Sequence, residues 1–378
     1  MADVLSVPQG RFNLRRLPLR RRELLRAYDA SDEYLLNYLS EVQLPPVGAR
    51  VLIVNDSFGA LTVALHEFKP TALSDSYLSQ QATLMNFSAN ALSIDGVRLM
   101  TSLELPVQSY DLIVIKSPKT LALLEYQLIT LRPFMTPATR IITAGMVKNL
   151  STTVWRLLET IVGPTNSAKA WKKARLIFSL PDDKISLPVN PYPIHYRLEG
   201  TNYTIVNHAN VFSRDSLDIG TRFFIEYIGC FPNAETIIDL GCGNGIIGLL
   251  AAELNPNAVV HFVDESFMAI ASARENFERA FGDSRLANFS VGDCLSDFTA
   301  ESADVVLCNP PFHQQNAVGD MIAAKMFRQA REIIKRGGAL RVIGNRHLGY
   351  HLELKKLFGN ASVIAANRKF VILQSIVE

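Results

Sequence analysis

The residues of this chain best suited to chemistry form the run Asn309-Pro310-Pro311-Phe312, which directly follows the strand-like stretch 304–308. The two prolines fix φ and remove two backbone donors, so this turn presents carbonyl oxygens and has little freedom. The side-chain oxygen of Asn309 and the carbonyl of Pro310 can accept both N–H bonds of a planar amine and turn its nitrogen toward an electrophilic methyl group. Phe312 offers a ring on which a flipped-out base can stack. We therefore predict that Asn309, Pro310 and Phe312 are catalytic.

A glycine-rich loop at 237–248, with the sequence IIDLGCGNGIIG, is the second candidate site. Its apolar run, acid, alternate glycines and helical spacing predict a strand, a tight turn and a helix. The pattern G-x-G-x-x-G at 243–248 fits a dinucleotide pyrophosphate at a helix N-terminus, and an ordinary strand-to-helix turn is a further alternative. The frame of an acid followed by alternate glycines resembles the first motif of S-adenosylmethionine-dependent methyltransferases. In that frame the cofactor contacts are Asp239, Gly241, Gly243 and Gly245, and we predict that Asn309 contacts the cofactor as well.

Further acids fall at the ends of expected strands. Asp264 follows the apolar run 259–263, a position from which nucleotide-type sites accept hydrogen bonds from ribose, and Glu265 could take its place. Asp293 ends another strand-like run and can accept from an adenine amino group, with a backbone N–H contributed by Cys294. An acid pair is also a common helix cap and Gly-Asp is ordinary turn chemistry, so each assignment has a structural alternative.

The segment 211–221 lies just ahead of the helix expected over 222–228. Its small and polar residues are explained equally well by a capping turn and by a lid beside the methionine end of the cofactor. In the second interpretation, Phe212 packs near the transferred methyl group. The candidate cofactor contacts of this segment are Phe212, Ser213, Asp218, Gly220 and Thr221.

The composition limits the classes of protein to consider. The 378 residues, 48% of them hydrophobic, suit two domains and exclude a largely disordered chain. No apolar run approaches the ~20 residues of a membrane span, and the N-terminus lacks the apolar core of a secretory signal. The four cysteines lie far apart with no C-x-x-C pair, which argues against a metal site or a disulfide framework. We expect a reduced, cytoplasmic, monomeric protein without metal or membrane contact.

Positive charge is concentrated in the first half of the chain. Residues 1–199 hold 22 Lys and Arg against 17 Asp and Glu, whereas residues 200–378 hold 16 against 19. An arginine-rich run over 11–26 predicts salt-dependent contacts with phosphates, although charge runs are often only solvated faces. The predicted RNA-binding residues are Arg15, Arg16, Arg20, Arg21, Arg22, Lys116, Lys119, Lys172 and Lys173.

The two halves of the chain repeat one pattern. Residues 51–65 match 237–251 at an offset of 186, and later matches drift to offsets of 190 and 193 in unbroken order, which indicates two copies of one α/β fold. The first copy has lost the acid and two of the loop glycines, and Lys-Ser-Pro-Lys at 116–119 replaces Asn-Pro-Pro-Phe. We therefore predict that the first copy is catalytically dead. Because its strand pattern survives these losses, we expect the glycines to serve a ligand.

The whole chain resembles the ribosomal RNA guanine-N2 methyltransferases, a family with members that act on small-subunit rRNA and members that act on large-subunit rRNA. The motifs that carry the resemblance are the segment 211–221, the loop at 239–245, Asp264 and the run 309–312. The resemblance implies an α/β protein with two tandem class I (Rossmann-like, seven-stranded) methyltransferase folds, the N-terminal one degenerate. It implies an RNA-binding domain over 1–182, a linker over 183–200 and a catalytic domain over 201–378. It also implies S-adenosylmethionine as cofactor and methyl transfer to N2 of a guanine in 23S rRNA.

Other substrates stay open, because Asn-Pro-Pro-aromatic also serves adenine-N6, cytosine-N4 and protein glutamine methylation. A guanine of small-subunit 16S rRNA is the first alternative, and adenine-N6 or protein glutamine methylation is the next. A non-enzymatic RNA-binding assembly factor is the last. The duplicated basic domain favours RNA over protein as the substrate, and the intact loop at 239–245 argues against an assembly factor.

Overall fold

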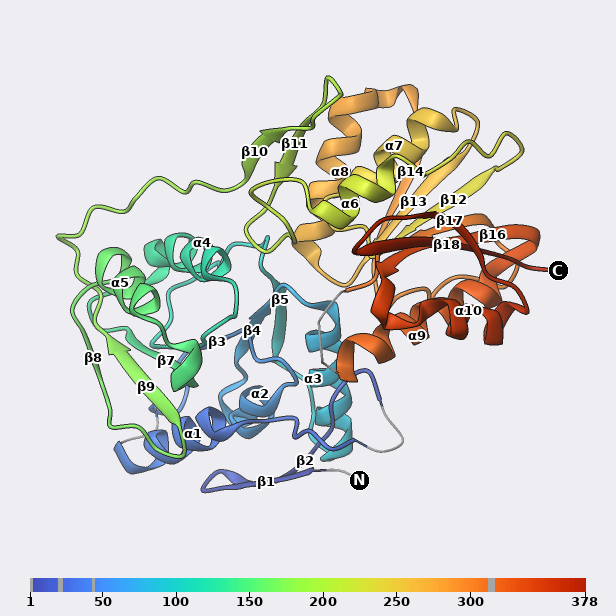
Figure 1. Cartoon of the computed structure of the whole chain (residues 1–378). Helices are drawn as coiled ribbons and strands as arrows, with labels where there is room; N and C mark the ends of the chain where they lie inside the picture. The colour runs from blue at the N-terminus through green and yellow to red at the C-terminus, as the bar shows by residue number, and fades with distance from the viewer. Residues whose placement is uncertain (1–2, 20–22, 43–44, 312–316) are drawn as a thin grey trace. The chain divides into compact units, whose positions relative to one another are not determined.

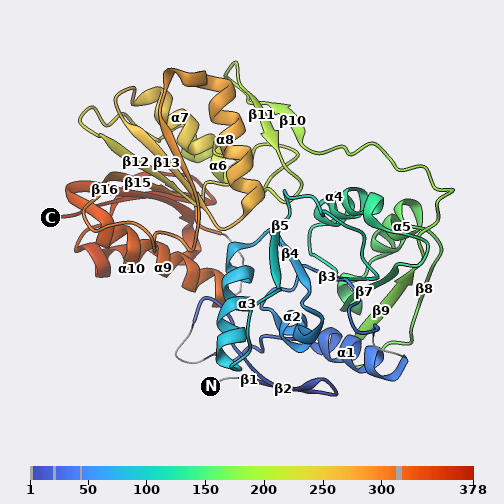
Figure 2. The same cartoon turned by 180° about the vertical axis from the view of Figure 1, so that it is seen from behind.

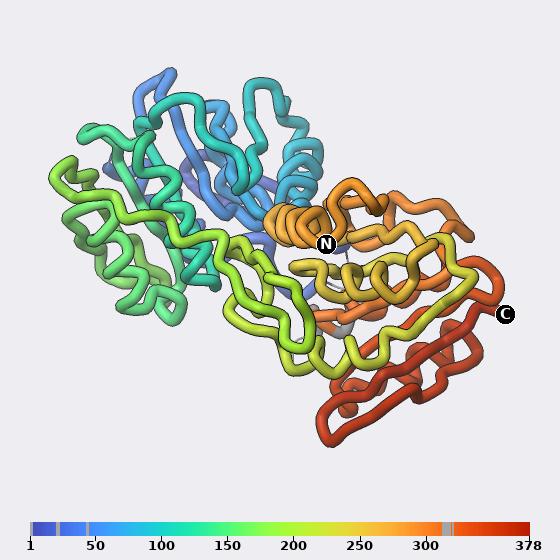
Figure 3. Tube along the Cα trace, turned by 90° about the horizontal axis from the view of Figure 1, so that it is seen from above, coloured from blue at the N-terminus to red at the C-terminus, as the bar shows by residue number. Residues whose placement is uncertain are grey.

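The computed structural model describes residues 3–19, 23–42, 45–311 and 317–378. The chain divides into two compact units, Met1–Tyr192 (unit 1) and Pro193–Glu378 (unit 2). Each unit is one continuous stretch of chain, blue to green in unit 1 and yellow-green to red in unit 2 (Figure 3). Each unit therefore buries its own core of aliphatic and aromatic side chains.

Unit 1 contains a hairpin of β1 and β2 (Figure 1) and a seven-stranded sheet in the order β5-β4-β3-β6-β7-β9-β8. The strands from β5 to β7 in that order pair in parallel, and β9 pairs antiparallel with β7 and β8. The strands are β1 (Asp3–Val7), β2 (Gly10–Leu14), β3 (Val51–Val54), β4 (Thr71–Ser74), β5 (Arg98–Thr101), β6 (Leu112–Lys116), β7 (Arg140–Met146), β8 (Thr165–Ser167) and β9 (Ala174–Ser179). The α-helices are α1 (Ala30–Val42), α2 (Ala60–Ala64), α3 (Tyr77–Ala89), α4 (Leu121–Leu131) and α5 (Thr152–Ile161), with short 3-10 turns at His66–Phe68, Arg132–Phe134 and Val147–Asn149.

Unit 2 repeats this plan with the sheet order β14-β13-β12-β15-β16-β18-β17 and a hairpin of β10 and β11. Its strands are β10 (Ile194–Arg197), β11 (Thr204–Asn207), β12 (Thr236–Leu240), β13 (Val259–Asp264), β14 (Ala287–Val291), β15 (Ala303–Cys308), β16 (Ile334–Asn345), β17 (Ser362–Ala366) and β18 (Phe370–Ile376). Its α-helices are α6 (Ile219–Ile225), α7 (Ile246–Leu254), α8 (Phe267–Phe281), α9 (Ala317–Ile333) and α10 (Tyr350–Phe358), with 3-10 turns at Gly282–Ser284 and Arg346–Leu348. Strand β18 runs antiparallel to β16, as the sequence predicted for the last strand.

The central strands are apolar runs because helices cover both faces of each sheet. All four residues of β3 are buried. In unit 2, helices α6, α7 and α8 lie on one side of the sheet and α9 and α10 on the other (Figure 2). Ile237 packs in the core with the first group, whereas the next residue, Ile238, packs in the core with the second. Successive side chains of a strand point to opposite faces, so one short apolar run serves both cores.

The two sheets have the same strand order, position for position, which confirms the predicted duplication. A pair of hydrogen bonds between an Asn side chain and the backbone, called the clamp here, occurs in both units as well. Asn86 on α3 exchanges two hydrogen bonds of 2.9 Å with the backbone of Arg15. Asn276 on α8 exchanges two with the backbone of Val206, at 2.7 and 3.0 Å. In both units the clamp ties the preceding hairpin to the helix after the second parallel strand.

The segment 183–200, predicted as a linker, contains regular structure in its second half. β10 begins at Ile194 and pairs antiparallel with β11, so this part belongs to the hairpin of unit 2. Over the ranges that the structure describes, no helix is long and apolar enough to cross a membrane. Over the same ranges, no three His, Cys, Asp or Glu side chains gather as a metal site requires.

Candidate active site

Asn309 directly follows β15, at the edge of the sheet where the parallel strands of unit 2 end. Its Nδ2 donates a hydrogen bond to Thr221 Oγ1 at 3.0 Å. Its Oδ1 is buried, and none of the described residues gives it a hydrogen bond. A buried acceptor without a partner is costly unless a ligand pairs with it. This oxygen is therefore a candidate acceptor for a bound amine.

Three glycines shape the loop between β12 and α7. Gly241, Gly243 and Gly245 have φ values of 72°, 54° and 79°, in the left-handed region that glycine tolerates best. A Cβ on Gly245 would lie 2.8 Å from the Cβ of Ala273, so this glycine lets α7 pack on α8. A Cβ on Gly243 would meet nothing within 4 Å. Packing thus requires Gly245, whereas Gly243 borders open space, and the predicted ligand contacts of these glycines stay a prediction.

Asp239 on β12 is fully buried. Its Oδ2 accepts a hydrogen bond from the Gly248 N–H at 2.8 Å, in the first turn of α7. No residue in the described part of the chain pairs with its Oδ1. Burial raises the pKa of this carboxyl to about 7, although the hydrogen bond from Gly248 opposes the rise. Asp239 thus ties the strand to the helix and has one oxygen available to a ligand.

Asp264 is the last residue of β13 and braces the glycine loop. Its Oδ2 accepts from the Gly243 N–H and its Oδ1 from the Ser266 N–H, both at 3.0 Å. Burial raises the pKa of this carboxyl. Each carboxylate oxygen has a second lone pair, so Asp264 keeps the capacity to accept from ribose hydroxyls, and that contact stays a prediction. Glu265 beside it is exposed.

Asp293 and Cys294 follow β14. Lys325 on α9 places its Nζ 2.5 Å from Asp293 Oδ2, a contact that no sequence pattern indicates. The backbone of Cys294 has a φ of 56°, and burial raises the pKa of its thiol to about 12, so it is a neutral thiol at physiological pH. The predicted adenine contacts stay a prediction, and Lys325 is a charged neighbour of the site that sequence reasoning missed.

The segment ahead of α6 both caps that helix and contacts Asn309. Asp218 is the N-cap residue, and its Oδ2 accepts from the Thr221 N–H at 2.9 Å, which confirms the capping interpretation. The hydroxyl of Thr221 is the partner of Asn309 Nδ2. The other predicted residues of the segment are Gly220, which is buried, Phe212, which is 66% exposed, and Ser213, which has a φ of 51°.

These residues fit S-adenosylmethionine. Gly243 leaves space beside the loop, and Asp239 and Asn309 each have a buried oxygen that lacks a partner among the described residues. Carboxylates at adjacent strand ends suit an ammonium group and ribose hydroxyls. The same sheet edge therefore combines a candidate cofactor site with an acceptor for an amine.

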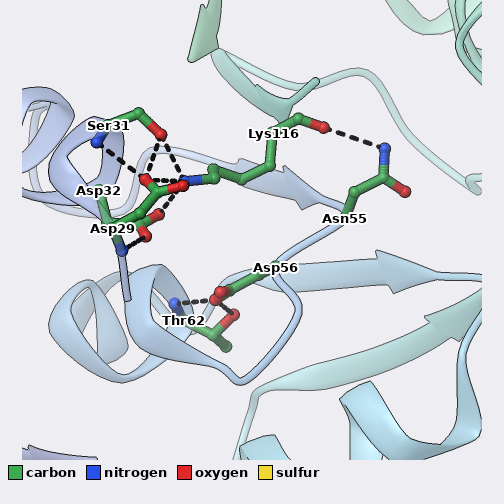
Figure 4. A network of polar contacts seen from close by, with 7 residues as sticks. All are labelled: Asp29, Ser31, Asp32, Asn55, Asp56, Thr62 and Lys116. Carbon is green, nitrogen blue, oxygen red and sulfur yellow. Dashed lines mark hydrogen bonds and ion pairs between the residues drawn. The ribbon is translucent and has the colours of Figure 1, made fainter. Parts of the chain in front are cut away.

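In unit 1 the corresponding place is filled by the chain's own side chains (Figure 4). Lys116, at the end of β6, has its Nζ 2.6 Å from Asp32 Oδ1 and Ser31 Oγ and 3.0 Å from Asp29 Oδ1. Burial alone would lower the pKa of Lys116, but Asp32 and Asp29 outweigh burial and raise it. The prediction that Lys116 contacts RNA is wrong, because its ammonium is buried and paired.

The polar groups of the unit 1 loop are also hydrogen-bonded within the unit. Asn55 takes a φ of 64° at the position equivalent to Gly241, and its Nδ2 donates to the Lys116 carbonyl at 3.2 Å. Asp56 Oδ2 accepts from both the N–H and the Oγ1 of Thr62 at 2.8 Å, and so takes over the role of Asp239 toward the helix (Figure 4). Unit 1 thus satisfies internally the groups that unit 2 leaves open.

The other basic residues predicted to bind RNA differ in their surroundings. Arg15, Lys119 and Lys173 are exposed. Lys172 is exposed but lies 3.1 Å from Glu33 Oε2. Arg16 donates to the Arg26 carbonyl at 2.9 Å and lies over the Phe58 ring, 4.5 Å from its centroid. The predicted residues Arg20, Arg21, Arg22 and Phe312 lie outside the described residues.

Two family models match this chain, the RLMG N-terminal domain over residues 2–183 and the Methyltransferase small domain over residues 202–374. Among curated proteins, ribosomal RNA large subunit methyltransferase G of Aeromonas salmonicida is 47% identical over 377 residues, covering 100% of both chains. The proteins of the same name from Erwinia tasmaniensis and Streptomyces avermitilis are 48% and 45% identical, covering 98% and 100% of both chains.

Among solved structures, the T. thermophilus 16S rRNA N2 G1207 methyltransferase in complex with AdoMet and guanosine matches this chain with a TM-score of 0.76. The match covers 100% of this chain and 98% of that chain at 21% sequence identity. At that identity the likeness establishes the shared fold, with both seven-stranded sheets included.

Proposed function

This chain belongs to the family of ribosomal RNA large subunit methyltransferase G, and we propose that it transfers the methyl group of S-adenosylmethionine to N2 of a guanine in 23S rRNA. The family establishes a methyltransferase that acts on large-subunit rRNA. The choice of an exocyclic amine rests on the site itself, and the choice of guanine N2 among such amines follows the resemblance of the whole chain to the guanine-N2 methyltransferases. Because ribosomal RNA is the substrate, the cytoplasm is the proposed location.

The observation that carries the choice of an amine is the buried Oδ1 of Asn309. This oxygen has no hydrogen-bond donor among the described residues, although the Nδ2 of the same amide is held by Thr221. The site therefore presents an acceptor in a fixed direction, next to a turn that Pro310 restricts. An exocyclic amine supplies the donors that such an acceptor requires.

In the proposed mechanism the protein orients the nucleophile. S-adenosylmethionine, when bound, supplies a methyl group that its sulfonium makes electrophilic. Asn309 Oδ1 and the Pro310 carbonyl accept the two N2 hydrogens of guanine, which directs the nitrogen lone pair toward that methyl group. Fixing the amine in this way supplies much of the rate, because the amine of a conjugated base is a poor nucleophile in free rotation. The bond formed is N2–C, and the bond broken is that between the methyl carbon and sulfur.

The same two oxygens guide the proton that must leave. After transfer, N2 carries one surplus hydrogen and a positive charge, and it is strongly acidic because loss of that proton restores the conjugation of its lone pair with the base. An amide oxygen and a peptide carbonyl are far too weak as bases to keep that proton, so they pass it to water. No general base with a raised pKa is required for this step.

Asp239, Gly243 and Asp264 would hold the cofactor. The Oδ1 of Asp239, which has no partner among the described residues, would accept from an ammonium group, and the ligand's positive charge would then favour ionisation of this carboxyl. Asp264 would accept from ribose hydroxyls while it braces the loop through Gly243. Asp293 would accept from the adenine amino group while Lys325 neutralises its charge.

Unit 1 is proposed as the RNA-holding domain. It has the catalytic positions filled by its own network and carries exposed cations at Arg15, Lys119 and Lys173, in the half of the sequence with excess positive charge. Lys116 is left out of this set because its ammonium is buried. Exposed cations that contact phosphates add affinity irrespective of sequence, which leaves recognition of the target base to unit 2.

The test is transfer of a tritium-labelled methyl group to ribosomal RNA purified from a strain that lacks the gene. The proposal predicts incorporation into 23S rRNA and background counts in 16S rRNA and in the protein fraction. Incorporation into 16S rRNA would identify the small-subunit alternative, and incorporation into protein would identify glutamine methylation. Absence of transfer to any fraction, with cofactor binding absent in calorimetry, would leave a non-enzymatic RNA-binding factor.

A further inference from the structure

We propose that Asp218 and Thr221 form a positioning pair that decides which way round the Asn309 amide faces in the site. The sequence interpretation made both residues cofactor contacts, whereas the contacts assign them a task toward Asn309. This inference rests on the proposed function, because it concerns the atom that accepts the hydrogen of the target amine.

The three side chains form a short chain of hydrogen bonds. Asn309 Nδ2 lies 3.0 Å from Thr221 Oγ1. Thr221 Oγ1 in turn lies 3.4 Å from Asp218 Oδ2, the oxygen that also accepts from the Thr221 N–H at 2.9 Å. Asp218 caps α6, so the chain links the start of this helix to the end of β15.

The direction of these bonds follows from what each group can donate. An ionised carboxylate can only accept, so the single hydroxyl proton of Thr221 is directed to Asp218. The Thr221 oxygen then offers only lone pairs to Asn309, and the amide must turn its NH2 toward them. The carbonyl oxygen of the amide is therefore left facing away from Thr221, and this is the buried Oδ1 that lacks a partner in the described structure.

The alternative orientation would disable the site. If the amide were rotated by a half turn, its NH2 would face the N–H donors of the target amine, and donor would oppose donor. Asn309 Oδ1 would then need the Thr221 hydroxyl proton, which would have to leave Asp218. A fixed carboxylate at one end of the chain thus determines that an acceptor, and not a donor, is presented at the other end.

Unit 1 supports the view that these positions are built to contact each other. Asp29 and Asp32 stand at the start of α1 with the same spacing as Asp218 and Thr221 at the start of α6. The residue that ends β6, Lys116, reaches both of them, as Asn309 after β15 reaches Thr221. The contact between strand end and helix start has therefore persisted in both copies.

The chemistry of that contact differs between the units in the way that the inference requires. In unit 1 the contact is an ion pair, and an ammonium has donors only, so it can present no acceptor to the hydrogens of an amine. In unit 2 a neutral hydroxyl and a neutral amide occupy the two positions, and this pair leaves an acceptor free. Only the unit with the open glycine loop has a contact that yields such an acceptor.

The test compares four variants in full-length protein. Thr221→Val keeps the shape of the side chain and removes the hydroxyl, and Thr221→Ser restores the hydroxyl. Asp218→Asn keeps a good helix cap but adds a donor, so the hydroxyl proton is no longer directed to it. Thr62→Val is the matched control, since Thr62 donates to Asp56 in unit 1 with the same backbone and hydroxyl pattern.

For each variant, kcat with 23S rRNA and the Kd for S-adenosylmethionine are measured. We expect kcat of Thr221→Val to fall about 10- to 100-fold with a Kd within about threefold of wild type, the scale of a misdirected reacting group. Thr221→Ser should recover kcat to within about threefold, Asp218→Asn should fall between the two, and Thr62→Val should keep the wild-type kcat.

Two results would overturn the inference while the proposed function stands. One is a Thr221→Val protein with wild-type kcat. The other is a Kd that rises by the same factor as kcat falls, which would make Thr221 a cofactor contact. If wild type itself transfers no methyl group, the proposed function fails, and hydrogen exchange of the Asn309 side-chain amide decides the inference separately. Exchange should be faster in Thr221→Val than in wild type and Thr221→Ser, and equal exchange in all three contradicts the positioning pair.

Discussion

At the scale of single residues, Asn309 and Asp239 share one property. One polar atom of each side chain makes a hydrogen bond, and the other, a buried oxygen, has no partner in the described structure. The two oxygens differ in kind. The amide oxygen of Asn309 is neutral at every pH and suits an amine hydrogen. The carboxyl of Asp239 can change its charge and suits a cationic group. The two side chains should therefore fail in different ways when they are changed.

Asn309→Ala should remove methyl transfer and leave cofactor binding largely intact. The amide oxygen acts on the amine and not on the cofactor, so kcat should fall by at least about 10²–10³-fold, the range seen for a lost electrostatic contact to a reacting group. Calorimetry with S-adenosylmethionine supplies the control, because its Kd should stay within about threefold of wild type. A variant with more than a tenth of wild-type activity contradicts the assigned role.

Asp239→Asn should change the pH dependence of stability. The fold raises the pKa of Asp239 from 3.8 to about 7, so the folded protein favours the protonated carboxyl. As pH rises from about 4 to about 7, the unfolded chain ionises more readily than the folded protein, and the free energy of unfolding falls. Above that window wild type carries the full cost of ionisation, on the order of a few kcal/mol, whereas Asn carries none.

Thermal unfolding without cofactor measures this effect at pH 5 and pH 8. The melting temperature of Asp239→Asn relative to wild type should rise between these two values, and titrations of all other groups cancel in the difference. The same variant should bind S-adenosylmethionine more weakly at pH 8. A constant difference in melting temperature across this range would contradict a raised pKa.

At the scale of elements, the turn from β12 to α7 divides its glycines between two tasks. Gly245 and its counterpart in unit 1, Gly59, both have left-handed φ, of 79° and 76°. A Cβ on Gly245 would lie 2.8 Å from Ala273 on α8, and a Cβ on Gly59 would lie 2.7 Å from Thr83 on α3. Gly243 also has a positive φ, but its missing Cβ borders open space. Packing thus requires a glycine at positions 245 and 59, whereas the space beside Gly243 suits a ligand.

Alanine substitutions should separate the two tasks. Gly245→Ala should destabilise unit 2 by about 2–4 kcal/mol, because positive φ and overpacking add, and Gly59→Ala should do the same to unit 1. Gly243→Ala should cost only about 1 kcal/mol of stability but weaken S-adenosylmethionine binding at least about tenfold. Unfolding and calorimetry on the three proteins check this, and the account fails if Gly243→Ala binds the cofactor as wild type does.

The elements and their order were within reach of the sequence, for a physical reason. Apolar runs flanked by turn residues indicate where a buried parallel strand lies. Because the fold is duplicated, each strand is indicated by two separate stretches of sequence. Asp239 and Asn309 were found because a strand end and the turn after it are adjacent in the sequence. Such local patterns contain most of the information needed to place the candidate site.

Contacts across large sequence separations were out of reach. Lys116 was predicted to be a surface cation, because nothing near it in the sequence indicates that Asp29 and Asp32 bury it from another element. The contact of Thr221 with Asn309 joins residues 88 apart and is equally invisible in a linear pattern. Polar partners of this kind depend on packing, which only the folded chain defines.

At the scale of the whole molecule, one fold serves two purposes. Among the described residues, Asp239 and Asn309 of unit 2 each have an acceptor oxygen without a partner and Gly243 borders open space, while unit 1 fills the same place with an ion network. The excess of positive charge lies in the half that contains unit 1. A copy that pairs these polar groups internally but keeps exposed cations is suited to hold a polyanion.

Replacing Arg15, Lys119 and Lys173 by Ala should weaken RNA binding without changing cofactor affinity. Each phosphate contact that is lost should lower the slope of log affinity against log salt by about 0.7–0.9. The matched control replaces Lys355, Lys356 and Arg368, three exposed cations of unit 2. Filter binding of 23S rRNA fragments across a salt series compares the two triple variants, and equal slopes in both would argue against unit 1 as the RNA-holding domain.

The central claim is that this enzyme methylates the exocyclic N2 of a guanine in 23S rRNA. Mass spectrometry of nucleosides tests it most directly, with 23S and 16S rRNA from a strain lacking the gene, each incubated with the protein and S-adenosylmethionine. The account predicts newly formed N2-methylguanosine in 23S rRNA at a single position, none in 16S rRNA, and none in either with Asn309→Ala. Methyl groups on adenine N6 or on a ring nitrogen, or N2-methylguanosine formed only in 16S rRNA, would contradict it.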